Sequence, residues 1–114
     1  MALAIASREV DGVTVVELSG RITLGEGSVQ MRDAIRELIA KGQRRILLDL
    51  GEVNYIDSSG LGELVSAYTS AKNQNAALKL LKLTKKVHDL LQLTKLYTVF
   101  DIFDDEASAI ASFK

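Results

Sequence analysis

The stretch RILLDLGEVNYIDSSGLGELVSAYTSAKN, residues 45–73, decides how this chain folds. Its first part, 45–50, is almost continuously apolar, as in a strand that is covered on both faces. Further on, apolar residues recur at the spacing of one helix face, namely Leu61, Leu64, Val65, Tyr68 and Ala71. The sequence therefore predicts a strand, a junction at 57–62 where the strand turns into a helix N-terminus, and a helix that begins within two residues of Ser58 and ends near Asn73.

The predicted start of this helix combines an acid, two hydroxyls and two glycines. The first N–H groups of a helix have no partner within the helix, and the side chains of Asp57, Ser58 and Ser59 can all accept from them. The helix dipole also favours an anion at this end. Gly60 and Gly62 are poor helix formers, and we expect them to leave the backbone bare, so that another molecule can approach. On local chemistry alone, serine and aspartate before an apolar periodic run are most often ordinary helix caps and glycines near a turn most often turn residues, so the purely structural interpretation stays open.

Two β-prone runs precede this stretch, at 3–10 and 13–19. They are separated by Asp11-Gly12, and such a pair between apolar runs predicts a hairpin with a type I′ turn. The first run is the weaker one, and we expect it to be an edge strand.

The segment 20–27 is predicted to be a loop. Within it, Thr23 and Glu26 fit a capping box for a helix that Gly42 closes. The apolar face of that helix is expected to be Met31, Ile35, Leu38 and Ile39.

Further elements follow the central stretch. Residues 77–83 and 98–103 are predicted strands, and Thr84 is expected to cap a short helix between them. Acidic residues at 104–106 suit the first turn of a last helix. The inner faces of these two helices are expected to be Val87, Leu90 and Leu91, and Ala107, Ile110 and Phe113. A hairpin followed by alternating strands and helices predicts an α/β fold with a mixed sheet of four or five strands and about four helices.

The string YIDSSGLG at 55–62 resembles the signature of bacterial anti-sigma factor antagonists, the stand-alone STAS domains. The chain length, the Leu-Ser-Gly at 18–20, the strand at 47–50 and the order of elements also fit, so the resemblance covers the chain as one STAS domain, 1–114. In that family the serine directly after the aspartate is phosphorylated. The resemblance therefore implies phosphorylation at Ser58, with Ser59 as the second choice.

The resemblance also implies partners. The unphosphorylated form would bind an anti-sigma factor that is a serine kinase and so free a sigma factor; the kinase would inactivate the chain at Ser58, and a metal-dependent phosphatase would reset it. Family members often carry an acid where this chain has Arg21 and Thr23, a departure that bears on which kinase is bound. The implied partner-binding residues are Arg21, Thr23, Asp57, Ser58, Ser59, Gly60, Leu61 and Gly62.

Two other functions remain open at this point. One is a STAS scaffold or interaction module, in a stress-sensing or transport complex, that is never phosphorylated. The other is a nucleotide-binding module that uses the helix start at 57–62 as an anion site, although the chain has no Gly-Lys-Ser/Thr phosphate loop.

Composition excludes several function classes. The chain has 114 residues, 47% of them hydrophobic, and a formal net charge of −1, which disfavours nucleic acid or an anionic membrane as the main partner. It has no cysteine and therefore no disulfide framework or thiolate metal site. No apolar run approaches the roughly 18 residues of a membrane span, and no signal peptide is recognisable, so we expect a cytoplasmic protein.

The sequence also lacks the residues of a catalytic site. A serine nucleophile needs a base, and the single histidine, His88, lies thirty residues after Ser58 in a position expected at the surface or its boundary. Ile56 replaces the first glycine of a G-x-S-x-G elbow, and the dinucleotide fingerprint fails at Val65. The acids have no metal-ligand spacing. We therefore expect a binding protein rather than an enzyme, with no catalytic residue, metal or cofactor.

Overall fold

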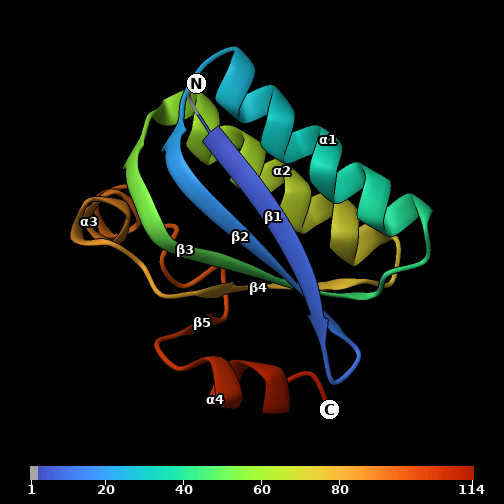
Figure 1. Cartoon of the computed structure of the whole chain (residues 1–114). Helices are drawn as coiled ribbons and strands as arrows, with labels where there is room; N and C mark the ends of the chain where they lie inside the picture. The colour runs from blue at the N-terminus through green and yellow to red at the C-terminus, as the bar shows by residue number, and fades with distance from the viewer. Residues whose placement is uncertain (1–2) are drawn as a thin grey trace.

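Five strands form one sheet in the order β1-β2-β3-β4-β5. A computed structural model describes residues 3–114, and within them four helices cover this sheet (Figure 1). Strand β1 is antiparallel to β2, and all other neighbours are parallel. The predicted α/β fold with a mixed sheet is confirmed. The elements are β1 (Leu3–Val10), β2 (Val13–Ile22), α1 (Glu26–Ala40), β3 (Arg45–Ile56), α2 (Ser58–Asn73), β4 (Ala77–Leu81), α3 (Lys85–Leu93), β5 (Ile102–Phe103) and α4 (Glu106–Ala111).

The hairpin forms as predicted. Asp11 and Gly12 have φ values of 51° and 81°, the two positive values that a type I′ turn requires. Strand β1 pairs only with β2 and is an edge of the sheet, also as predicted.

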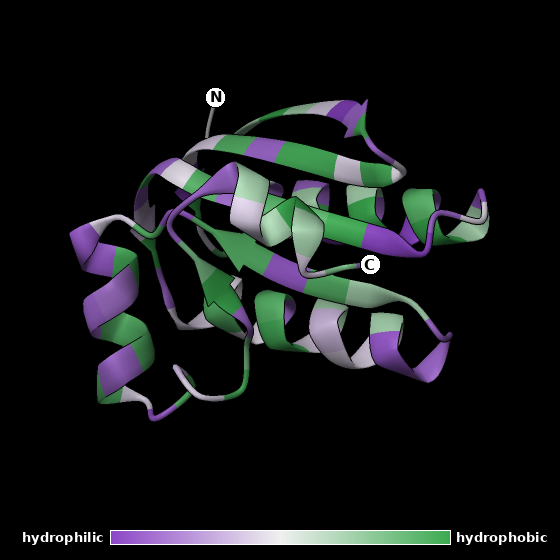
Figure 2. Cartoon of the chain, turned by 90° about the horizontal axis from the view of Figure 1, so that it is seen from below, coloured by the Kyte–Doolittle hydropathy of each residue, from purple (hydrophilic) through white to green (hydrophobic). Residues whose placement is uncertain are grey.

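The sheet has a hydrophobic layer on each face. Helices α1 and α2 lie side by side on one face, and α4 lies on the other (Figure 1). Side chains alternate along β2, so Val16 and Leu18 join the larger cluster under α1 and α2, whereas Val13 and Val15 face α4. Seen from below, α4 lies in front of central strands whose residues are largely hydrophobic (Figure 2). Helix α3 packs with Val87 and Leu91 into the larger cluster, with Leu90 half-buried beside them.

Strands β2 and β3 are both longer than predicted. Strand β3 continues to Ile56 rather than ending at Leu50, and β2 continues into the expected loop as far as Ile22. Their register shifts twice, between Glu17 and Ser19 and again between Gly20 and Arg21. Such bulges bend a strand and re-aim its side chains. Because Arg21 and Ile22 pair with Tyr55 and Ile56, both strands extend as far as the start of α2.

The predicted capping box of α1 is wrong. The N-cap is Gly25, which has a φ of 90° and no side chain, and Thr23 instead offers its carbonyl oxygen to the amide and hydroxyl of Ser28, at 3.0 and 2.7 Å. Strand β2 extends to Ile22 and the helix begins only at Glu26, so Thr23 lies two residues before the N-cap position. At the other end Gly42, with a φ of 90°, closes the helix as predicted.

Two details near the C-terminus differ from the prediction, and one contact there was not predicted. The last strand is only Ile102–Phe103, because Phe100 turns into the core and Val99 closes a turn onto Leu96. Ala107 is exposed, whereas Ala109 and Ile110 face inward. The Nζ of Lys79 donates to the carbonyl and hydroxyl oxygens of Ser112, at 3.0 Å each, and so ties the end of the chain to β4.

Candidate functional site

The strand-to-helix junction is built around Asp57. Strand β3 ends at Ile56, and Asp57, in an extended conformation, is the N-cap of α2. Its Oδ1 accepts from the amide of Gly60 at 2.8 Å. The predicted helix start is confirmed, and of the three candidate caps it is Asp57 whose carboxylate satisfies one of the orphan N–H groups.

The second oxygen of Asp57 holds a different part of the chain. Its Oδ2 accepts from the amide of Leu24, in the β2–α1 loop, at 2.9 Å. The hydrogen bonds from Gly60 and then Leu24 stabilise the charged form and hold the pKa of Asp57 below its usual range. Asp57 therefore fastens the loop to the start of α2. Sequence reasoning missed this role because the contact joins residues 33 positions apart.

Ser58 is the first residue of α2, and it is exposed. Within residues 3–114, its hydroxyl makes no hydrogen bond. Ser59 is half-buried. Since Asp57 caps the helix, neither hydroxyl is required for that purpose, and Ser58 is the more accessible of the two.

The two glycines of the junction have different roles. Gly60 is buried, and a Cβ there would overlap the carbonyl oxygen of Ile22 and lie 2.9 Å from its Cγ2. The interpretation of Gly60 as bare backbone open to a partner is therefore wrong: its missing side chain lets α2 pack against the end of β2. Leu61 is also buried, at 6% exposure, so its side chain belongs to the core. Gly62 is exposed, with no atom within 4 Å of an added Cβ, and leaves open surface as expected.

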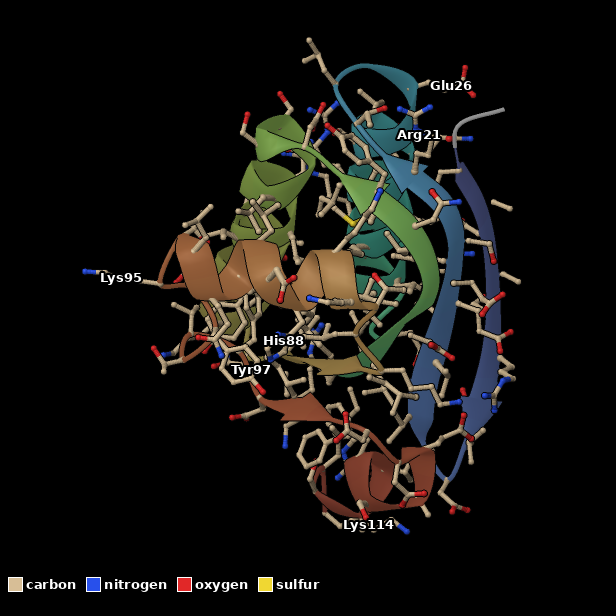
Figure 3. The ribbon with its side chains drawn as sticks, turned by 90° about the vertical axis from the view of Figure 1, so that its left-hand side faces the viewer. Arg21, Glu26, His88, Lys95, Tyr97 and Lys114 are labelled. Atoms are coloured by element: carbon tan, nitrogen blue, oxygen red, sulfur yellow. The ribbon has the colours of Figure 1, made fainter. Side chains whose placement is uncertain are left out.

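Arg21 and Thr23 lie at the carboxyl end of β2 and just beyond it. Arg21 is exposed and pairs in register with Tyr55 of β3. Its guanidinium carbon lies 5.2 Å from the centre of the Tyr55 ring, a cation–π contact. Figure 3 shows Arg21 at the same end of the molecule as the start of α2. Thr23 is half-buried, and its backbone carbonyl oxygen accepts from the amide of Ser28.

Two open grooves flank the start of α2, and sequence reasoning identified neither. The first, which we call the α3 groove, has a volume of about 610 Å³ and is lined by Tyr55, Ile56, Asp57, Ser58, Lys86, Asp89, Leu90 and Leu93. The second, the α1 groove, has a volume of about 290 Å³ and is lined by Leu24, Val29, Arg32, Ser59, Gly62 and Glu63.

Exposed apolar side chains concentrate in these grooves. The large hydrophobic residues exposed in the described part of the chain are Leu24, Val29, Tyr55, Leu93 and Val99. All but Val99 line one of the two grooves. Leu24, in the α1 groove, and Leu93, in the α3 groove, are exposed by 78% and 81%.

The remaining candidate groups are His88 and the acidic residues. The side chain of His88 is 43% exposed, contacts Asp89 at 3.5 Å and packs edge-on against Tyr97, 5.0 Å away between ring centres (Figure 3). Among residues 3–114, no three metal-binding side chains come together. No helix in that part of the chain is both long and apolar enough to cross a membrane.

Comparison with known proteins identifies the family. The STAS domain model matches residues 4–109. The chain belongs to the STAS domain family. It is 30% identical over 111 residues to the anti-sigma F factor antagonist of Paenibacillus polymyxa, covering 96% of this chain and 94% of that one.

Solved structures agree with this assignment. A crystal structure of a candidate anti-sigma factor antagonist from Thermotoga maritima superposes with a TM-score of 0.86 at 26% identity, over 95% of this chain and 92% of that one. The anti-sigma factor antagonist SpoIIAA, in its unphosphorylated form, superposes with a TM-score of 0.80 at 21% identity, over 96% of each chain. The resemblance inferred from YIDSSGLG and the expected STAS fold are both confirmed.

Proposed function

We propose that this chain is an anti-sigma factor antagonist that binds an anti-sigma factor while Ser58 is unphosphorylated and is switched off by phosphorylation of Ser58. Membership of the STAS family and the names of its relatives support the first part. The observation that carries the second part is the exposed Ser58 hydroxyl, which makes no hydrogen bond within the described residues and sits beside an aspartate that already caps the helix.

This geometry suits a switch that acts on binding rather than on folding. A phosphoserine carries about −1.5 to −2 charges at neutral pH. At the first residue of α2 the helix dipole favours that charge, so the helix stays formed. The phosphate would stand between the two grooves and add bulk and charge to a surface that Gly62 keeps low. The related fold of SpoIIAA has been solved in a phosphorylated form, TM-score 0.75, so this fold accepts such a modification.

The proposal includes the partners. The anti-sigma factor is a serine kinase that phosphorylates Ser58 when it releases the antagonist, and a metal-dependent phosphatase restores the hydroxyl. Ser59 is the less suitable acceptor because it is half-buried in the α1 groove, where a phosphate would lie near Glu63.

The test is a calorimetric titration of the unphosphorylated chain against each anti-sigma factor kinase of its host, repeated with chain that the kinase has phosphorylated. We expect one kinase to bind the unphosphorylated chain and to lose at least tenfold in affinity after modification, which corresponds to about 1.4 kcal/mol. Peptide mapping by mass spectrometry should place the phosphate on Ser58.

Other outcomes favour the alternatives. Tight binding to a kinase with no phosphate on Ser58, in the test tube or in protein taken from its native cells, would indicate a constitutive STAS scaffold. Absence of binding to every anti-sigma factor would contradict the proposed function as a whole.

A further inference from the structure

The α3 groove holds a cation, Lys86, that has no acidic partner among the described residues. Its two acids are engaged within the chain: Asp57 accepts from two backbone amides, and Asp89 lies 3.0 Å from Lys85 and 3.5 Å from His88. Lys86 lines the same groove and is exposed. No carboxylate of residues 3–114 lies within ion-pair distance of it.

A second cation without an acidic partner, Arg21, lies beside the groove, over the ring of Tyr55. Arg21 is exposed, and none of the described carboxylates lies within ion-pair distance of its guanidinium. Its position is set instead by the ring of Tyr55, 5.2 Å away, and by its place opposite Tyr55 in the sheet. A guanidinium held over an aromatic face keeps its N–H groups available at its edge, so it can bind a carboxylate without first losing much side-chain freedom.

The same groove also presents apolar side chains. Tyr55 is 39% exposed and Leu93 81% exposed, and half-buried Leu90 lies with them. Leu93 is the last residue of α3, where its side chain contributes little to the core that Val87 and Leu91 fill. The apolar surface and the two cations together form one patch beside Ser58.

We propose that the α3 groove binds a segment of the anti-sigma factor that presents an apolar side chain flanked by carboxylates. Tyr55, Leu90 and Leu93 receive the apolar side chain, while Arg21 and Lys86 pair with the carboxylates. This inference rests on the proposed function and adds the chemistry of the partner's contact segment.

Charge complementarity selects this occupant over others. A basic segment would bring like charges against Arg21 and Lys86, and like charges in an interface cost several kcal/mol. A purely apolar segment would cover both cations and leave them without partners, which is also unfavourable. A segment with carboxylates avoids both costs and gains charge-assisted hydrogen bonds.

The same arrangement gives phosphorylation a second means of releasing the partner. Ser58 and Lys86 line one groove, so a phosphate on Ser58 offers Lys86 an anion from its own chain. That phosphate then competes with the partner's carboxylate for Lys86 and repels it at the same time.

The experiment is a calorimetric titration of Arg21→Glu, Lys86→Glu and the double variant against the one anti-sigma factor that binds the wild-type chain. Arg36→Glu is the matched control, because it makes the same change of charge at an exposed arginine on α1 that lines neither groove. We expect each single variant to bind at least roughly tenfold more weakly, the double variant to bind more weakly still, and Arg36→Glu to bind like wild type.

Further arms test the identity of the contact. Raising the salt concentration should weaken wild-type binding more than that of the double variant, since only wild type has these ion pairs to screen. An anti-sigma factor in which the contacting Asp or Glu is changed to Lys should bind Arg21→Glu or Lys86→Glu more tightly than the unchanged anti-sigma factor does. The same variant anti-sigma factor should bind the wild-type chain weakly. Thermal melts check that the variants are folded, and Arg21→Gln and Lys86→Gln replace any variant that is not.

The outcomes separate the two proposals. If the charge variants bind like wild type while phosphorylation of Ser58 still abolishes binding, the inference is overturned and the proposed function stands. If the Glu variants bind more tightly, the partner segment is basic and the inference is wrong. If the wild-type chain binds no anti-sigma factor, both fall together.

Discussion

Asp57 and Ser58 are neighbours with separate tasks. The carboxylate of Asp57 uses both oxygens on backbone amides, those of Gly60 and Leu24, and so belongs to the framework. The hydroxyl of Ser58 has no partner among the described residues and faces solvent. Of these two side chains only that of Asp57 holds the junction together, so the proposed phosphorylation of Ser58 would disturb no hydrogen bond of the fold among the described residues.

The first prediction concerns Ser58. Ser58→Ala should leave the free energy of unfolding within about 0.5 kcal/mol of wild type, as is usual for exposed positions without structural contacts. It should keep binding to the anti-sigma factor and lose phosphorylation. Urea denaturation and a kinase assay with mass detection measure both. Ser59→Ala is the matched control and should still be phosphorylated; full phosphorylation of Ser58→Ala would instead assign the switch to Ser59.

The second prediction concerns Asp57. Asp57→Ala removes the cap of α2 and the acceptor for the Leu24 amide, so the melting temperature should fall by an amount on the order of several degrees. Hydrogen exchange should become faster at the amides of Leu24 and Gly60, while exchange in β4 changes little. Equal protection of Leu24 in variant and wild type would show that the loop does not depend on this carboxylate.

At the scale of elements, the contact between α2 and β2 depends on one missing side chain. Gly60 is buried where α2 crosses the carbonyl of Ile22, and Gly62, one half-turn further on, is open to solvent. The helix start thus has one glycine for packing and one on the surface that the partner is proposed to cover.

The third prediction follows from this difference. Gly60→Ala should destabilise the fold by about 2–3 kcal/mol, because the new methyl group overlaps backbone atoms that cannot move alone. Gly62→Ala should be neutral or should stabilise the helix by up to about 1 kcal/mol, since Ala is the better helix former. Urea denaturation of the two variants measures the contrast. Equal effects at both positions would contradict the packing role of Gly60.

The elements that the sequence predicted well have strong local signals. Helix α2 carries a helical apolar period and an aspartate cap, and the β1–β2 hairpin has Asp-Gly at its turn. The errors come from contacts between distant segments. The capping box at Thr23 failed because β2 pairs with β3 beyond Gly20, and no local pattern announces that pairing. The packing role of Gly60 depends in the same way on Ile22, which only the folded chain brings near.

Across the molecule two carboxylates join segments that are far apart in the chain, and a third caps a helix. Asp57 connects the β2–α1 loop to α2, and Glu106 of α4 pairs with Arg8 of β1, at 3.1 Å from Nη1 to Oε2. Asp105 caps α4 by accepting from the amide of Ser108 at 2.9 Å. The site, the edge strand and the helix on the second face of the sheet are thus held partly by ionised acids.

These contacts make the free energy of unfolding depend on pH in the acid range. Hydrogen bonds from backbone amides hold the pKa of Asp57 and of Asp105 below the usual range, and the side-chain bond from Arg8 does the same for Glu106. A carboxylate whose pKa is lower in the folded state stabilises the fold fully above its unfolded pKa, which is about 3.9 for Asp and 4.3 for Glu. That stabilisation disappears as the pH falls through the folded value.

The fourth prediction is therefore a melting temperature that is nearly constant from about pH 7 to pH 5 and falls steeply below about pH 4. Circular dichroism melts across this range measure it. Asp105→Asn should have a lower melting temperature than wild type at pH 7. The two melting temperatures should converge at acid pH, because protonation removes the same contact from wild type.

Asp104→Asn is the matched control. Asp104 is exposed and makes no ion pair or side-chain hydrogen bond within residues 3–114, so the melting temperature of this variant should follow that of wild type at every pH. If Asp104→Asn and Asp105→Asn change the curve equally, acid sensitivity reflects net charge alone. If they differ as expected, it reflects particular carboxylates such as Asp105, which caps α4.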